Sequence, residues 1–312
     1  MGFFSKRPVI ATHNGKYHAD DVFACAVLQI VLGGRGTIVR TRDEQVIAAA
    51  EYAVDVGMVN DPASHRFDHH MPEGGGVRTS GIPYASFGLV WKEYGAAISA
   101  MGAPGISDSV AAEIAARIDH TLASPIDADD NGMPIVQPTG ETYPYTLQSF
   151  LYMHRPTWKE RDDTYDSAFL KLVDLAKEII LREVVIARDT LDARSIVEAA
   201  YAAAEDKRVV AIDMNCPWQE TLVAHPEPLI VVTPRRGTKG WGVNVVPAGE
   251  RTYENRILLP ESWAGLRDAE LASVTGVADA LFCHRARFLA VAKTKEGALA
   301  LAKIAISKEQ VK

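Results

Sequence analysis

Histidines and aspartates gather in the first quarter of the 312-residue chain, in an order that suits metal-dependent chemistry. Imidazole and carboxylate ligands without thiolates suit Mn²⁺ or Mg²⁺, with Zn²⁺ and Fe²⁺ as further options. Two such ions, bridged by one carboxylate, clamp a phosphate, activate a water and stabilise the leaving oxygen. The residues concerned are His13, His18, Asp20, Asp21, Asp55, Asp68, His69 and His70. The pattern predicts a metal-dependent phosphoesterase site that holds two divalent ions.

Taken alone, most of these motifs have a simpler interpretation. Asp20 suits the N-cap of a helix, and Asp68-His69-His70 is a short tripeptide with many accidental matches. Asp55 is harder to explain, because it closes an apolar run and a carboxylate there is costly to bury unless it is paired or bound to metal. We therefore assign Asp55 the bridging role and place Asp68, His69 and His70 with it at the catalytic centre.

A further acidic group, residues 127–132, follows a helix expected to end near His120. Asp-Asn-Gly is common turn chemistry, so the group by itself indicates a solvated turn. Because acidic and imidazole motifs precede it, we favour a metal-ligand role for Asp127 and Asp130 instead.

The elements that would position these residues alternate between strand and helix. Apolar runs predict strands at 7–12, 37–41 and 53–56, and helices at 20–32 and 43–52. Short connections between them indicate an α/β fold, with a mainly parallel sheet and helices on both faces. Ligands of such sheets sit at the carboxyl ends of the strands, which is where His13, Asp55 and Asp68 fall.

The length of the chain suits two domains. Residues 166–204 form an uninterrupted helical pattern, and a second alternation with strands at 208–213, 229–233 and 241–246 follows. We place the boundary near residue 205. The prediction is a catalytic domain over 1–205, including a helical connector, and a smaller α/β substrate-binding domain over 206–312.

Composition limits the possible partners and location. A net charge of −7 gives no overall attraction to nucleic acid, so a polyanionic substrate needs a local basic patch or metal ions. Three widely spaced cysteines indicate neither disulfides nor a zinc knuckle. No apolar run is long enough to span a membrane, and residues 1–7 contain no targeting pattern, so we expect a cytoplasmic protein.

The order of the acidic and histidine motifs resembles the layout of the DHH phosphoesterase superfamily, and more closely the MYG1 (UPF0160) family. The similarity is carried by Thr12-His13-Asn14-Gly15, Arg40-Thr41-Arg42-Asp43, Val54-Asp55-Val56-Gly57, Phe67-Asp68-His69-His70, Ala85-Ser86-Phe87-Gly88-Leu89-Val90-Trp91, Asp130-Asn131-Gly132, Leu259-Pro260-Glu261-Ser262-Trp263-Ala264-Gly265-Leu266-Arg267 and Lys293-Thr294-Lys295-Glu296-Gly297-Ala298. These motifs extend over nearly the whole chain.

The resemblance implies a DHH-like catalytic domain and a metal-dependent 3′–5′ RNA exonuclease. It carries the metal-ligand role onto His13, His18, Asp20, Asp55, His69 and Asp130. Asp21 and Asp127 are second choices, because the first motif of DHH proteins is usually spaced differently. The resemblance also implies that Asp68 and His70 support the ligands or contact the substrate phosphate.

The C-terminal domain would then bind the substrate. The candidates are His284, Arg285, Arg287, Lys293, Lys295, Arg235 and Arg236, with Trp241 nearby to stack on a base. Each taken singly also fits a solvated surface residue. Similar family members carry Phe-Ile-Gly-Gly where this chain has Phe288-Leu289-Ala290-Val291, so the close backbone approach that paired glycines allow is in question.

Three functions stay open at this point. The first is exonucleolytic cleavage of RNA or short oligonucleotides by a two-metal mechanism. The second is hydrolysis of pyrophosphate or nucleotide monoesters at the same site, because metal clamps recognise phosphate first. The third is a metal-stabilised binding protein without hydrolysis. The sequence also leaves open the native metal and the oligomeric state, for which a homodimer is one option.

Overall fold

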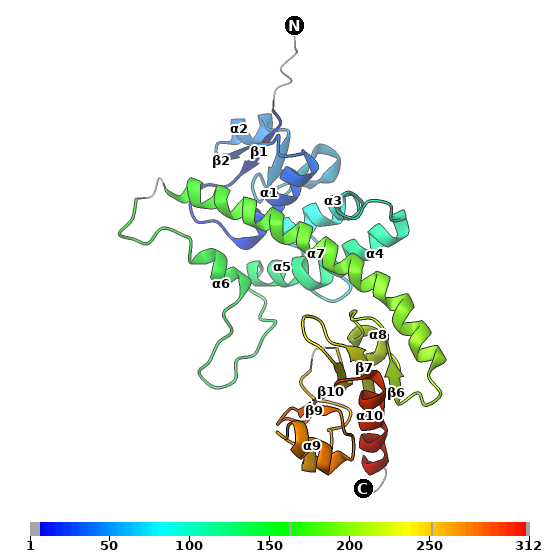
Figure 1. Cartoon of the computed structure of the whole chain (residues 1–312). Coiled ribbons are helices and arrows are strands. Elements are labelled where there is room, and N and C mark those ends of the chain that lie inside the picture. The colour runs from blue at the N-terminus through cyan, green and yellow to red at the C-terminus, as the bar shows by residue number, and fades with distance from the viewer. Residues whose placement is uncertain (1–6, 162–163, 251, 310–312) are drawn as a thin grey trace. The chain divides into compact units, whose positions relative to one another are not determined.

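The computed structural model describes residues 7–161, 164–250 and 252–309 and forms two compact units, which divide between Arg188 and Asp189 (Figure 1). The dividing point falls within the long helix α7, Thr164–Ala203, which confirms the predicted uninterrupted helix. The assignment of catalysis to residues 1–205 and substrate binding to 206–312 stays a prediction. Of the residues expected to lack a targeting pattern, 1–6 lie outside the described residues. No helix among the described residues is long and apolar enough to cross a membrane.

The N-terminal unit is built on a five-stranded sheet in the order β2-β1-β3-β5-β4. Its strands are β1 Val9–Thr12, β2 Thr37–Arg40, β3 Tyr52–Val54, β4 Asn60–Asp61 and β5 Arg66–Phe67. Strand β1 pairs parallel with β2 and β3, and β3 pairs parallel with β5. This confirms the mainly parallel α/β fold. The antiparallel edge strand β4 was not predicted, because two polar residues carry no periodic signal.

Helices cover the sheet as the alternation predicts. Helix α1, Ala19–Val31, is buried along most of its length, and its Phe23 ring packs 5.1 Å from that of Phe87 on α3, Ser86–Gly102. Helix α2, Glu44–Ala49, packs Ile47 with alanines of β1 and β3. The buried α1 and the apolar side of α2 therefore both pack within the N-terminal core.

The helix that we expected to end near His120 continues into the acidic group at 127–132. Helix α4, Asp108–Ile118, continues through a π-helical segment, Asp119–Ala123, into α5, Ser124–Asp130. Asp127 to Asp130 are thus helical, and only the following Asn131 and Gly132 turn. Pro125 lies just after the π-helical segment, where the regular α-helical hydrogen-bond pattern is already interrupted, so the helix accommodates it there. A short helix α6, Leu147–Tyr152, follows.

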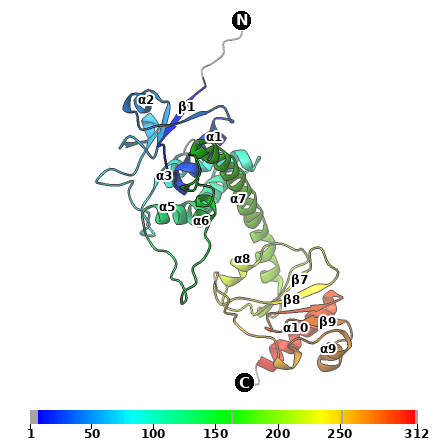
Figure 2. The same cartoon turned by 90° about the vertical axis from the view of Figure 1, so that its left-hand side faces the viewer.

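The C-terminal unit has its own five-stranded sheet, in the order β6-β7-β8-β10-β9. Its strands are β6 Val209–Ala211, β7 Ile230–Pro234, β8 Trp241–Val245, β9 Ala280–Cys283 and β10 Leu289–Ala292. Only β6 and β7 pair in parallel, so this sheet is mixed. Its helices are α8 Gln219–Val223, α9 Asp268–Thr275 and α10 Lys295–Glu309. Helix α10 packs along β7, β8 and β10. Figure 2 shows α10 together with β7, β8 and β9 in this unit. The core of the unit contains Trp263.

Candidate metal centre

Most of the predicted N-terminal site residues meet at the carboxyl edge of the first sheet. His13 directly follows β1, Asp55 follows β3 and Asp68 follows β5. Because these strands are parallel neighbours, their ends lie side by side. His13, Asp20, Asp21, Asp55, Asp68 and His69 are all buried. A group of ionisable side chains is therefore enclosed in the fold rather than displayed on its surface.

The first turn of α1 supplies two of the carboxylates. His18 caps the helix, and its backbone N–H donates to Asp21 Oδ1 at 3.0 Å. Asp20 Oδ2 accepts the backbone N–H of Ser86 at 3.2 Å, which ties α1 to the start of α3. The positive end of the helix dipole lowers the cost of holding both carboxylates here. Gly15, with φ of 83°, allows the sharp turn that leads from β1 into the helix.

Asp55 stands between two histidines. Its Oδ2 lies 3.1 Å from His13 Nε2, and its Oδ1 lies 3.3 Å from His69 Nε2. The Ser86 hydroxyl donates to Oδ1 at 3.1 Å and orients the carboxylate. The backbone of Asp55 adopts the left-handed conformation, with φ of 56°, directly after β3. One carboxylate with its two oxygens toward different imidazoles has the form of a bridging metal ligand.

Asp130, at the end of α5, completes the cluster from another element. Its Oδ2 lies 3.1 Å from His69 Nε2, and its Oδ1 lies 3.7 Å from His18 Nδ1. His69 Nε2 is also 3.8 Å from Asp20 Oδ2, and His13 Nε2 is 3.0 Å from Asp21 Oδ2. The structure thus brings the histidines and aspartates of four sequence motifs within contact distance.

These donors form three overlapping sets whose ligand atoms lie within 4.8 Å of one another. The sets are His13, His18 and Asp55; Asp55, His69 and His70; and His18, Asp20 and Asp130. Four buried ligand atoms make no hydrogen bond within the described part of the chain: His13 Nε2, His69 Nε2, Asp20 Oδ1 and Asp21 Oδ2. The two imidazole nitrogens and Asp21 Oδ2 have the close ion-pair contacts given above, whereas Asp20 contacts His69 through its other oxygen, Oδ2. Buried polar atoms without hydrogen bonds are costly. Their mixed nitrogen and oxygen chemistry fits a divalent cation.

The electrostatics agree with an excess of negative charge. Burial lowers the pKa of His13, but the carboxylates of Asp21 and Asp55 outweigh it and raise that pKa to about 10. Burial also lowers the pKa of His69, but the carboxylates of Asp130 and Asp55 outweigh burial and raise that pKa to about 10. Burial and then the neighbouring Asp55 and Asp130 raise the pKa of Asp20. The cluster therefore attracts positive charge, and a divalent ion binding there would displace protons from the imidazoles.

Asp68 and His70 have a supporting geometry. Asp68 Oδ1 accepts the backbone N–H of His69 at 2.7 Å and contacts His70 Nδ1 at 2.7 Å, while Oδ2 accepts the N–H of Met58 at 2.6 Å. Asp68 therefore fixes the backbone that presents His69. The half-exposed His70 lies at the mouth of the site, with Nδ1 3.5 Å from Asp55 Oδ1.

Asp127 is held by groups that the sequence did not single out. Its Oδ2 accepts from Arg78 Nη2 at 2.7 Å, and its Oδ1 accepts the backbone N–H of Gly88 at 3.1 Å. Arg78 also binds Asp119 with two guanidinium nitrogens. Burial raises the pKa of Asp127 to about 7, although Arg78 opposes the shift. Asp127 thus anchors the helix that carries Asp130. No local signal marks Arg78, which is a single arginine after a glycine run.

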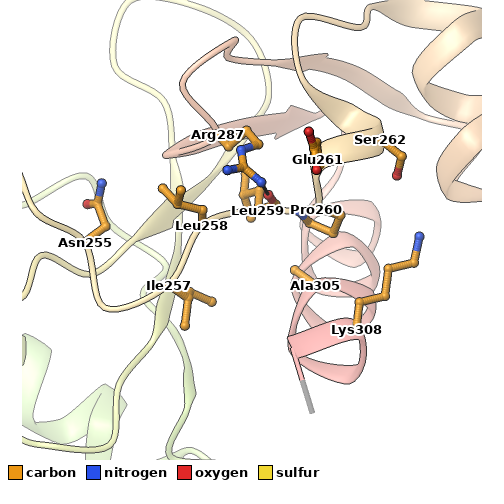
Figure 3. Close-up of a pocket in the computed structure, with 10 residues that line it drawn as sticks. All are labelled: Asn255, Ile257, Leu258, Leu259, Pro260, Glu261, Ser262, Arg287, Ala305 and Lys308. Carbon is orange, nitrogen blue, oxygen red and sulfur yellow. Dashed lines mark hydrogen bonds between the residues drawn. The ribbon is translucent and has the colours of Figure 1, made fainter. Parts of the chain in front are cut away.

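The predicted substrate-binding residues of the C-terminal unit occupy separate turns. Arg235 and Arg236 lie in the β7–β8 turn, and His284, Arg285 and Arg287 lie in the β9–β10 turn. Lys293 follows β10, and Lys295 pairs with Asp213. Of these seven, Arg287 alone lines a described cavity of about 450 Å³, where Lys308, Glu261, Ser262 and Asn255 also lie (Figure 3).

The positions at which the family resemblance leads us to expect paired glycines are ordinary strand residues here. Ala290 and Val291 belong to β10 and are 0% and 1% exposed. Ala290 pairs with Val243 on one side and Cys283 on the other. Their side chains fill the core, so this strand offers no open backbone surface at that point.

Comparisons with known proteins agree with the motif pattern. A family model described as "Uncharacterised protein family (UPF0160)" matches residues 9–306. The human protein named MYG1 exonuclease is 30% identical over 96% of this chain and 86% of its own length. The mouse MYG1 exonuclease is 31% identical over 96% of this chain and 85% of its own length. The MYG1 protein of Dictyostelium discoideum is 30% identical, with 94% of each chain covered.

Proposed function

The chain belongs to the MYG1 (UPF0160) family, and from this premise we propose that it is a metal-dependent phosphodiesterase with a DHH-like catalytic domain, which removes nucleotides from RNA or short oligonucleotides in the 3′–5′ direction. The printed names of the human and mouse relatives support the exonuclease activity. The preference for RNA and the direction come from the family resemblance.

The observation that carries the proposal is the position of Asp55 between His13 and His69. One divalent ion, Mn²⁺ or Mg²⁺, would be held by His13, His18 and Asp55, with Asp21 beside them. A second would be held by Asp55 and His69, with Asp130 and Asp20 beside them. When bound, such a pair of ions supplies water activation and stabilises negative charge on the phosphate.

The chain's own residues would orient the substrate around that centre. Asp68 holds His70 through Nδ1, and the Nε2 of His70 makes no hydrogen bond within the described residues. Because the hydrogen bond to Asp68 raises the pKa of His70, the ring would carry both protons, and its half-exposed Nε2 would then donate to a phosphate oxygen. Access of bulk water to that side of the site would be limited by the burial of His13, Asp20, Asp21, Asp55 and His69.

The test combines metal analysis with product analysis on the purified full-length chain. Metal content is measured, and labelled RNA, labelled DNA, pyrophosphate and 5′-nucleotides are each incubated with Mn²⁺, with Mg²⁺ and with chelator. We expect metal-dependent, stepwise shortening of RNA from its 3′ end. Hydrolysis of pyrophosphate or mononucleotides alone would replace the exonuclease by a small-molecule phosphatase. Binding of metal without hydrolysis of any phosphate ester would contradict an enzymatic role.

A further inference from the structure

Arg42 is a cation of the metal-site cavity that the proposed chemistry has not yet used. A cavity of about 270 Å³ opens above the metal ligands of the N-terminal unit. Its lining residues are His13, His18, Arg42, Asp55, Val56, Gly57, Met58, Asp68 and His70. Arg42 is the one lysine or arginine among these nine described residues. It is also the one lining side chain that keeps a positive charge at any pH of interest.

The fold fixes the backbone on both sides of Arg42. Strand β2 ends at Arg40, and the N–H of Thr41 donates to the carbonyl of Thr12 at 2.7 Å, directly beside His13. Asp43 then caps α2 by accepting from the N–H groups of Gln45 and Val46. Arg42 is thus carried at the same sheet edge as the metal ligands, between a paired strand and a capped helix.

Its neighbour Arg40 shows what an arginine with a purely structural role looks like here. The Arg40 side chain is buried, and it donates to Asp166 and to the carbonyl of Gly15, both at 2.7 Å. It also lies 4.6 Å from the centre of the Phe169 ring. The guanidinium of Arg42, in contrast, is exposed and makes no hydrogen bond or ion pair within residues 7–161. Nothing in the described fold uses its charge.

The geometry points to Arg42 as a positioning residue that binds phosphate oxygens of the substrate, an inference that rests on the proposed function. A phosphate approaching this cavity meets the carboxylates of Asp55 and Asp68 as well as the metal site. A guanidinium presents paired N–H donors that match two phosphate oxygens, and it does so without competing for metal. Arg42 would hold the phosphate beside the metal site, in the cavity that His70 also lines.

The experiment uses Arg42→Gln and Arg42→Lys, with Arg35→Gln as the matched control. Arg35 is an exposed arginine just before β2, at the amino end of the sheet, so it has the same charge change at the opposite edge. Inorganic phosphate is titrated calorimetrically into each Mn²⁺-loaded protein, and kcat and KM are measured on a short labelled RNA. Metal content is determined for every variant.

We expect Arg42→Gln to weaken phosphate binding and to lower kcat/KM by about 10- to 100-fold, the range of a charged hydrogen bond. Arg42→Lys should recover part of the loss, and added guanidinium ion should partly rescue an Arg42→Ala variant. Metal content and the Arg35→Gln control should match the wild type.

Two results separate this inference from the proposed function. If the wild type cleaves RNA and Arg42→Gln does so equally well with unchanged phosphate affinity, Arg42 has no positioning role and the exonuclease proposal stands. If the wild type cleaves no RNA, that proposal fails, and the phosphate titration alone decides the role of Arg42. Loss of manganese from Arg42→Gln would also overturn the inference, because the effect would then lie in the metal site.

Discussion

At the carboxyl edge of the N-terminal sheet, ionisable side chains are buried, face one another and leave four donor atoms without hydrogen bonds within the described residues. The seven predicted substrate-binding residues of the C-terminal unit are exposed or half-buried and are divided between the β7–β8 turn, the β9–β10 turn and the junction of β10 with the start of α10. Burying charge costs far more free energy than displaying it, so the N-terminal arrangement is compatible with a compensating divalent ion. The exposed residues need no such compensation.

The two sheets place the predicted residues differently. In the N-terminal unit, neighbouring parallel strands bring distant motifs to one point. In the mixed C-terminal sheet, the β7–β8 and β9–β10 turns each carry their own cations. We therefore expect single substitutions to have large effects in the first unit and small, salt-sensitive effects in the second.

The largest effect is expected from Asp55→Asn, because it removes the charge that both histidines face. Asparagine tolerates the left-handed backbone of this position, so the fold should be kept. Nucleotide release should fall by about 1,000-fold or more, together with loss of bound metal. Initial rates and elemental analysis measure both quantities.

The matched control for that substitution is Asp268→Asn in the C-terminal unit. Asp268 also has a positive φ, 42°, and starts an exposed turn of α9. It should leave rate and metal content unchanged. Wild-type activity in Asp55→Asn, or an equal loss in Asp268→Asn, would end the contrast between the units.

Metal removal should act on the N-terminal unit alone. Mn²⁺ at about 100 times its Kd should raise the free energy of unfolding by about 2.7 kcal/mol and the Tm by about 5–11 °C. Calorimetric scans with Mn²⁺ and with chelator measure the shift, and Asp55→Asn should abolish it. A shift that survives in that variant would place the responsible ion elsewhere.

A substitution at Gly88, whose backbone N–H donates to Asp127 rather than to a proposed metal ligand, should have an intermediate effect on stability and on Mn²⁺ binding. A Cβ at Gly88 would overlap Asp127 Oδ2 and Arg78 Nη2, so Gly88→Ala must disturb the pair that anchors α5. We expect a loss of about 1–3 kcal/mol in stability and weaker Mn²⁺ binding through Asp130. Urea unfolding and metal titration measure these changes.

Gly249→Ala is the control in the C-terminal unit, where an added Cβ would meet only Thr252 at 3.7 Å. It should be nearly neutral. If Gly88→Ala proved equally neutral, the Arg78–Asp127 pair would have no part in holding the site.

The smallest effect is expected from the double variant Arg235→Gln and Arg236→Gln. Exposed cations contribute to nucleic-acid binding mainly through counterion release, so KM for RNA should rise only a few-fold and the salt dependence should become shallower. Rates at several salt concentrations test this. A loss of 100-fold would show that the C-terminal turns form a specific site and would break the comparison.

The sequence by itself determined most of the elements of the N-terminal sheet and most of the residues that gather in the candidate metal centre. The apolar periodicity of 9–12 and 19–31 depends on local spacing alone, and so does the position of His13 and Asp55 just after strands. Once the strands are parallel neighbours, such residues must meet at one edge. These predictions needed no knowledge of long-range contacts.

Only the tertiary structure decided which atoms face which. The helix that begins with α4 continues past Pro125 into α5. Asp127 accepts a hydrogen bond from Arg78, and Asp130 lies beside His69. The tertiary structure also turns Arg40 into the fold and leaves Arg42 in the cavity, although the two lie in one short motif. Pairings between residues tens of positions apart depend on how helices pack against the sheet, and local sequence patterns do not encode that packing.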